Sequence, residues 1–128
     1  MIEKCENSIR KEEMLLKEIT KMMIELGIPA HLRGYYYLRE AVRMTAEEME
    51  LVGSVTKLLY PQIAKKFKCT GEKVERAIRN SIEVSWERGN TEFLEFLFGY
   101  SRKEGKKRPT NSEYIVVLAD YIRRKVLV

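Results

Sequence analysis

The chain has 128 residues, of which 45% are hydrophobic and 34% are charged, and its formal net charge is +5. This size and composition fit one folded domain with its own core and exclude a disordered or low-complexity chain. A single histidine and two distant cysteines cannot provide the four ligands of a structural zinc site, so we expect neither a metal nor a cofactor.

The hydrophobic pattern predicts helices, with few strand signals. Apolar residues recur at helical spacing from Ile9 to Leu26, and Gly27 ends this helix. A T-x-x-E capping box over 110–113 starts a last helix that runs to about residue 125, and a basic loop over 101–109 precedes it. Further helices are expected over 34–45 (or from His31), 46–59 with a bend at Gly53, 61–68, 71–88 and 91–98. The fold class is therefore all-α, a compact bundle of about six helices.

Basic residues are clustered rather than evenly spread. One group lies within 65–79, a second within 102–108 and a third at 123–125. Such clusters favour a polyanion as partner, although a basic protein without one would show the same net charge. No apolar run is long enough to span a membrane and no signal peptide opens the chain, so we expect a cytoplasmic protein that binds no membrane.

The stretch from Tyr60 to Asn80 has the pattern of a helix-turn-helix. Ala64 supplies the small residue that two closely crossing helices need, and the positions around the turn are apolar: Ile63, Phe67, Cys69, Val74, Ala77 and Ile78. Lys68 stands near the place of the usual turn glycine, which predicts a strained turn. An ordinary helical hairpin is the alternative interpretation of this pattern.

The second helix of this pair would present a polar face. With Val74, Ala77, Ile78 and Ser81 turned to the core, its outward residues are Glu72, Lys73, Glu75, Arg76, Arg79 and Asn80. These side chains can hydrogen-bond base edges or hold phosphates, and a merely solvated helix face would have a similar composition.

Five stretches resemble one known family, in order and over nearly all of residues 20–125. They are GIPAHLRGYYYLREAV (27–42), TKLLYPQIAKKF (56–67), VERAIRNSIEVSWERGN (74–90), LFGY (97–100) and RPTNSEYIVVLAD (108–120). They resemble the C-terminal effector domain of the sporulation stage-zero response regulator, a transcription factor of endospore-forming bacteria. The resemblance implies a recognition helix over 71–88, double-stranded DNA with TGTCGAA promoter boxes as target, nucleoid association, and tandem self-association on paired boxes.

The resemblance also implies roles for individual residues. Glu75 and Arg76 match the family pattern, whereas Glu72, Lys73 and Asn80 replace the Ser, Arg and His common there. The DNA-binding residues expected from pattern and resemblance together are Glu72, Lys73, Glu75, Arg76, Arg79, Asn80, Lys65, Lys66, Lys107 and Arg108.

A second surface implied by the resemblance would contact the RNA polymerase sigma factor. Its expected residues are Gly89, Phe93, Glu95, Phe98 and Arg102, of which Phe93 and Glu95 replace small polar residues of the family. Core packing is the alternative role for most of the apolar residues in this region. The last helix, with Ala119, matches the segment through which tandem domains meet.

We expect residues 1–20 to form a helical extension or linker remnant and residues 21–128 to form the effector domain. The family's receiver domain is missing, so the chain should bind DNA without phosphorylation, as an excised domain or as a protein without a receiver. No nucleophile, metal or phosphate-loop motif indicates an enzyme. A protein-interaction module that has lost specific DNA binding is the alternative function.

Overall fold

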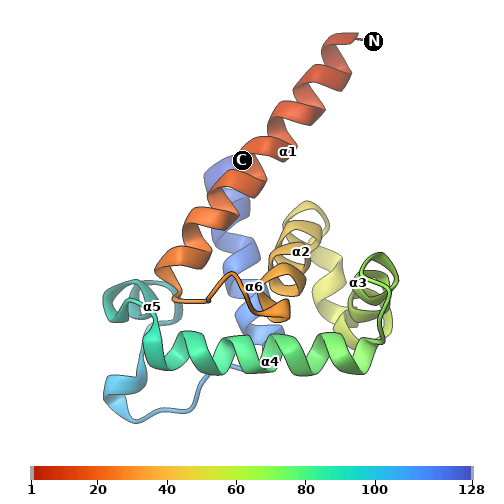
Figure 1. Ribbon diagram of the computed structural model, residues 1–128. Helices are drawn as coiled ribbons and strands as arrows, with labels where there is room; N and C mark the ends of the chain where they lie inside the picture. Colours follow the sequence, from red (N-terminus) through yellow and green to blue (C-terminus); the bar gives the residue numbers. More distant parts are fainter. Residues whose placement is uncertain (1, 128) are drawn as a thin grey trace.

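The computed structural model describes residues 2–127, with side chains from Ser8 onward. Six α-helices and no strand occupy this range, which confirms the predicted all-α bundle (Figure 1). The α-helices are α1 (Ile2–Glu25), α2 (Arg33–Glu47), α3 (Tyr60–Lys66), α4 (Gly71–Arg88), α5 (Thr91–Phe98) and α6 (Asn111–Ile122). Four short 3-10 or π segments join or follow them: η1 (Met49–Ser54), η2 (Val55–Leu59), η3 (Arg102–Glu104) and η4 (Arg123–Leu127).

The boundaries of α4 and α5 are the predicted ones, but other helix boundaries were wrong. Helix α1 begins at Ile2 rather than Ile9. The helix predicted over 46–59 does not form. The chain leaves the helical conformation at Glu48, with φ −139° and ψ 86°, and continues as η1 and η2. This irregular path still buries Leu51, Val55 and Leu59. Helices α3 and α6 end earlier than predicted, at Lys66 and Ile122.

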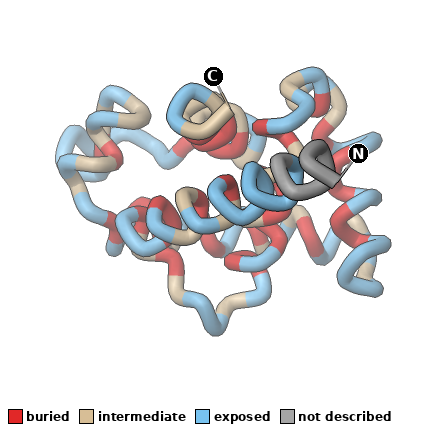
Figure 2. The backbone as a smooth tube through the Cα atoms, turned by 90° about the horizontal axis from the view of Figure 1, so that it is seen from above, coloured by how far each residue is buried: buried red, intermediate tan, exposed pale blue. Residues whose placement is uncertain are grey.

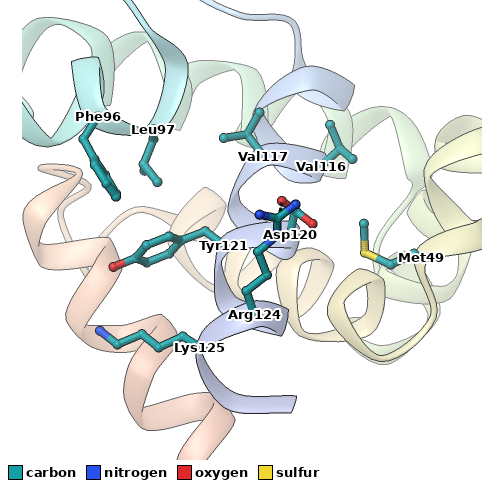
Figure 3. A pocket seen from close by; sticks show the side chains of 9 residues that line it. All are labelled: Met49, Phe96, Leu97, Val116, Val117, Asp120, Tyr121, Arg124 and Lys125. Carbon is teal, nitrogen blue, oxygen red and sulfur yellow. Dashed lines mark ion pairs between the residues drawn. The ribbon is translucent and has the colours of Figure 1, made fainter. Parts of the chain in front are cut away.

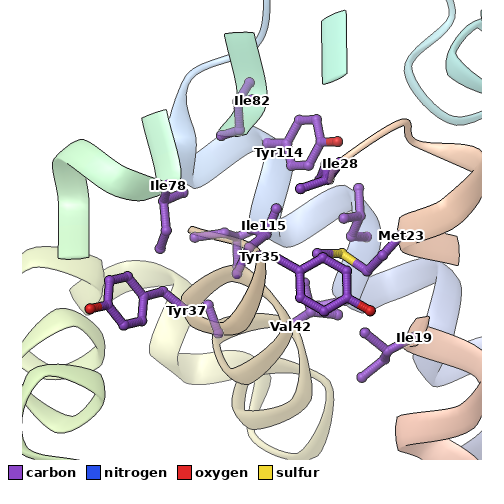
Figure 4. Packing of buried hydrophobic residues seen from close by; sticks show 14 of the residues in the cluster. Ile19, Met23, Ile28, Tyr35, Tyr37, Val42, Ile78, Ile82, Tyr114 and Ile115 are labelled. Atoms are coloured by element: carbon purple, nitrogen blue, oxygen red, sulfur yellow. The ribbon is translucent and has the colours of Figure 1, made fainter. Parts of the chain in front are cut away.

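Helix α2 is the centre of the bundle. It packs against α1, α4 and α6, and side chains from these four helices meet in one core (Figure 4). The core excludes solvent completely at its centre, where Leu38 of α2, Ile78 of α4 and Ile115 of α6 are all fully buried. Because a fully buried aliphatic side chain stabilises a fold by about 1.5–3 kcal/mol, this shared core holds α4 in place from behind.

The ends of α1 and α4 meet backbone to backbone. Gly27 has a left-handed φ of +69°, and a Cβ atom there would lie 2.8 Å from the Gly89 backbone. A Cβ atom on Gly89 would in turn lie 2.7 Å from the Leu26 carbonyl oxygen. The Asn90 N–H donates to the Glu25 carbonyl at 3.0 Å. Glycine is therefore required on both sides of this contact, which fixes α1 to the end of α4.

Helix α1 crosses residues 20 and 21 without a break. Leu15 and Ile19 lie in the core, whereas residues 8–14 are exposed, as the pale-blue turns of this helix show (Figure 2). On its other side α1 meets the last residues of the chain, where the Lys125 ammonium lies 3.1 Å from the Glu18 carboxylate. The N-terminal helix thus packs on the domain over its second half.

Candidate nucleic-acid interface

Helices α3 and α4 are joined by a four-residue turn, Phe67 to Thr70. The Cys69 N–H donates to the Ala64 carbonyl at 2.9 Å, and the Lys68 N–H donates to the Lys65 carbonyl at 3.4 Å. These two bonds form the Schellman pattern, which requires one left-handed residue. Lys68 adopts that conformation, with φ +54°. This agrees with the strained turn that the absence of a glycine predicts.

Helix α4 starts at a side-chain cap. The Thr70 hydroxyl oxygen accepts from the Lys73 N–H at 3.3 Å, which satisfies one free donor of the first turn. Beneath the helix, Val74 and Ile78 are fully buried, as is Ile63 on α3. Phe67, expected among the packed residues of the turn, is only partly covered, and its ring lies edge-on against Tyr37 at 5.1 Å.

Helix α2 supports α4 through direct backbone contact. Gly34 lies so close to α4 that a Cβ atom there would collide with the Ser81 hydroxyl and with the Ala77 carbonyl oxygen. Gly34 was not among the predicted site residues. A glycine in the first turn of a helix has no special pattern, and only the crossing explains its presence.

The outward face of α4 carries the predicted polar residues. Five are exposed: Glu72, Lys73, Arg76, Arg79 and Asn80. Glu75 is half-buried, and its carboxylate forms an ion pair of 2.8 Å with the Arg79 guanidinium one turn later. The face therefore combines cations, carboxylates and one neutral amide along a single helix.

Lys65 and Lys66 lie at the end of α3, and their surroundings differ. Both are exposed, but the Lys66 ammonium lies 3.0 Å from the carboxylate of Glu40, a buried residue of α2 that also pairs with Arg43. Burial alone would raise the pKa of Glu40, but the hydrogen bonds from Arg43 and Lys66 outweigh it and hold that pKa below its ordinary value. Lys66 thus ties α3 to α2.

The predicted basic loop runs beside α4 and contains η3. It ends at Lys107 and Arg108, which line a hollow together with Tyr60, Glu75 and Arg79. The Arg108 guanidinium pairs with Glu83 of α4 at 2.8 Å. The structure therefore brings the loop cations next to Glu75 and Arg79 on the outward face of α4, although the two groups are far apart in sequence.

One residue that lines this hollow, Asn111, was not among the predicted site residues. The Asn111 amide donates to the Tyr60 hydroxyl at 3.0 Å and to the Glu75 carbonyl at 3.1 Å. In the sequence, Asn111 follows the capping residue Thr110 and reads only as the start of a helix. No local pattern signals that it contacts both α3 and α4.

The residues expected to contact a sigma factor lie around α5, and most are engaged within the fold. Gly89 is buried, and the Glu95 carboxylate accepts from the Ser101 hydroxyl at 2.9 Å. Phe93 and Phe98 are partly buried against Tyr121 and Tyr114. The Arg102 guanidinium donates to the carbonyls of Trp86 and Gly89, at 3.1 and 3.4 Å.

An apolar groove lies between α5 and α6. Figure 3 shows its lining, in which Phe96 and Leu97 of α5 face Val117 and Tyr121 of α6. Phe96 is 68% exposed, and it was not among the residues predicted for this surface. Phe96 is two residues from the buried Leu94 and therefore lies on the opposite side of the helix. This spacing could have predicted that Phe96 is exposed. Ala119, expected near a tandem contact, is fully buried.

Other classes of site find no support in the described part of the chain. Among the side chains that the structure describes, from Ser8 to Leu127, no cluster of three His, Cys, Asp or Glu residues could hold a metal ion. None of the helices described combines the length and the apolar character that crossing a membrane requires. The Cys69 thiol is free and partly buried, and the side chain of Cys5 lies outside the described residues.

Comparison with known protein families agrees with the resemblance seen in the sequence. A family model described as "Sporulation initiation factor Spo0A C terminal" matches residues 19–122. The match begins within α1 and ends at the last residue of α6, so it includes the α3–α4 pair, the basic loop and α5.

Proposed function

Because the chain belongs to the Spo0A C-terminal family, a family of sporulation DNA-binding effector domains, we propose that it recognises TGTCGAA-like promoter boxes through α4. In this proposal α3 and α4 act as a helix-turn-helix, and α4 enters the major groove. The family is regulatory rather than enzymatic. We place the protein on the nucleoid when it is bound to DNA.

One observation carries the proposal: α4 is anchored on one side and polar on the other. Val74 and Ile78 are fully buried, while Lys73, Arg76 and Asn80 point to solvent from the same turns. Arginine and lysine suit guanine or phosphate, and asparagine suits adenine. A carboxylate such as that of Glu75 can accept a hydrogen bond from cytosine N4.

The basic residues around α4 support phosphate contacts. We propose that Lys65, Lys66, Lys107 and Arg108 contact the DNA backbone on either side of the groove that α4 enters. Lys66 and Arg108 already have carboxylate partners, so they would have to exchange these partners for phosphates. Phosphate contacts of this kind fix orientation and carry no sequence information.

Titration of a fluorescent duplex tests the proposal. The chain, without phosphorylation, should bind a TGTCGAA duplex more tightly than a scrambled duplex. About four to six neutralised phosphates should give a slope of log K against log salt near −4 to −5. Equal affinity for both duplexes with a slope near zero would reject DNA recognition and favour the interaction module.

We further propose that α5 and the following turn contact the RNA polymerase sigma factor. Phe96 is the strongest support, because it is an exposed aromatic side chain beside an apolar groove. The substitution Phe96→Ser should weaken binding of purified sigma factor to the DNA-bound chain and leave DNA affinity unchanged. The control is Ile9→Ser, since Ile9 is also an exposed apolar residue, at 55%, but lies in the first half of α1, away from α5. Equal effects of both substitutions would contradict the assignment.

Tandem self-association is the remaining proposal. The partly exposed residues Val117 and Asp120 of α6, which line the same groove as Phe96, would face a second copy on an adjacent box. The chain should be a monomer in solution and should bind two correctly spaced boxes with positive cooperativity. If changing the spacing by half a helical turn leaves the cooperativity intact, the two copies do not touch.

A further inference from the structure

We infer that Asn111 is a positioning residue for DNA recognition, which fixes the first turns of α4 on α3 from the start of α6. Its amide donates to the Tyr60 hydroxyl at 3.0 Å and to the Glu75 carbonyl at 3.1 Å. A primary amide carries two N–H bonds, so it can make both contacts at once. The inference rests on the proposed function, because it concerns how α4 is presented to DNA.

These two contacts act where the α3–α4 pair lacks another directional restraint. The turn bonds of Cys69 and Lys68 fix the pair at one end. Tyr60 is the first residue of α3, at the end away from the turn, and Glu75 is in the second turn of α4. The contacts between the helices are otherwise largely apolar and therefore non-directional. Hydrogen bonds of fixed length and angle can set the position of one helix along the other.

The Tyr60 hydroxyl needs the partner that Asn111 supplies. Tyr60 is only 4% exposed, and its burial raises the pKa of the hydroxyl, against a smaller opposite effect of the hydrogen bond from Asn111. Removing a partner from a buried polar group costs more than the bond itself contributes. The Asn111 contact is thus integral to the packing of α3.

Asn111 can act as a restraint because its own helix is firmly anchored. Thr110 and Glu113 form a capping box at the start of α6. One turn later Tyr114 is fully buried, and its hydroxyl lies 2.6 Å from the Ser85 hydroxyl of α4. Helix α6 therefore holds α4 at two places, and Asn111 is the one nearest the outward face.

The effect on DNA should fall on discrimination rather than on general affinity. The residue whose carbonyl Asn111 holds, Glu75, carries the carboxylate that pairs with Arg79 on the proposed reading face. A small displacement of these turns would misplace side chains against base edges, whereas flexible basic side chains would still reach phosphates.

Two substitutions and one control test the inference. Asn111→Ala removes both donors. Asn111→Asp keeps the volume and places a favourable negative charge in the first turn of α6, but an ionised carboxylate cannot donate to the Glu75 carbonyl. Ser112→Ala is the control, because Ser112 is the next residue of the same helix and is exposed.

Two measurements are needed on each variant of the full chain. Amide hydrogen exchange measured by NMR should become faster in residues 71–78 of both Asn111 variants, while the exchange rates in α2 of these variants stay unchanged. In Ser112→Ala the exchange rates should stay unchanged throughout. In duplex titrations, the ratio of affinities for the TGTCGAA duplex and the scrambled duplex should fall about tenfold, the size of one poorly read base pair. Affinity for the scrambled duplex and the salt slope should stay within about twofold.

Each other result overturns the inference. Faster exchange throughout the chain would show that Asn111 contributes only general stability. Local acceleration in α4 with an unchanged affinity ratio would show that DNA reading does not depend on this restraint. If the unsubstituted chain does not discriminate between the duplexes, the proposed function itself fails, and hydrogen exchange still decides whether Asn111 positions α4.

Discussion

Replacing Gly34 by alanine should separate α2 from α4. The added methyl group would collide with the Ser81 hydroxyl and with the Ala77 carbonyl oxygen. Ser81 could change its rotamer, but the Ala77 oxygen belongs to the backbone of α4 and cannot move without the helix. Overpacking of this kind costs roughly 1–3 kcal/mol. The higher helix propensity of alanine returns at most about 1 kcal/mol, and less in a first turn.

We therefore expect Gly34→Ala to lower the free energy of unfolding by about 1–3 kcal/mol. For a domain of this size the melting temperature should fall by roughly 4 °C for each kcal/mol. The assay is thermal and urea unfolding followed by circular dichroism. Gly53→Ala is the matched control, because a Cβ atom at Gly53 meets nothing within 4 Å. Equal stability of the two variants would refute the close crossing of α2 and α4.

Four further substitutions test the contacts of the site. Glu40→Gln should destabilise the protein by about 1–3 kcal/mol at pH 7, because charged hydrogen bonds are lost. Since the pKa of Glu40 lies below its ordinary value of 4.5, its contribution is present above that value and lost as the pH falls below it. In urea unfolding the difference in unfolding free energy between wild type and variant should shrink as the pH falls below 4.5, and a difference that stays constant would contradict the pairing. Lys68→Gly should relieve the left-handed turn and stabilise the protein by up to about 1 kcal/mol in the same assay, and a loss of stability would argue against strain. Glu75→Ala should cost about 1–3 kcal/mol on the TGTCGAA duplex and little on scrambled DNA. The control for Glu75→Ala is Glu87→Ala, because Glu87 is an exposed residue of the same helix. Lys107→Ala should weaken both duplexes alike and flatten the salt slope by about one unit. If Glu75→Ala and Lys107→Ala change the two affinities in the same proportion, Glu75 does not read bases.

The sequence predicts α4 and α5 well because their ends are determined locally. Thr70 and Asn90 accept hydrogen bonds from the first turns of these helices, and Gly99 follows α5 in the left-handed conformation. The helix predicted over 46–59 failed for the opposite reason. Leu51, Val55 and Leu59 repeat every four residues, which suits an α-helix, yet contact with the core bends this segment into η1 and η2. A hydrophobic period does not distinguish these related helices.

Some features of the candidate site could be predicted from the sequence and others could not. Helical periodicity alone predicts which side chains of α4 face outward, because Val74 and Ile78 must face the core. Periodicity cannot predict the partners of these side chains. Lys66 pairs with Glu40 of another helix, and Asn111 reaches Tyr60 across the fold. Such pairings depend on how whole helices pack, and no short sequence pattern determines them.

The central place of α2 has a consequence for synthesis on the ribosome. The face of α2 that packs on α6 stays uncovered until residues 111–122 have left the exit tunnel, and α6 contributes fully buried side chains at Tyr114, Ile115 and Leu118. Nascent chains that lack α6 would expose that apolar face, and partly folded chains of this kind are prone to aggregate. Chaperones that bind hydrophobic segments would therefore have an opportunity to bind at α2, and folding should be completed only after the last helix emerges.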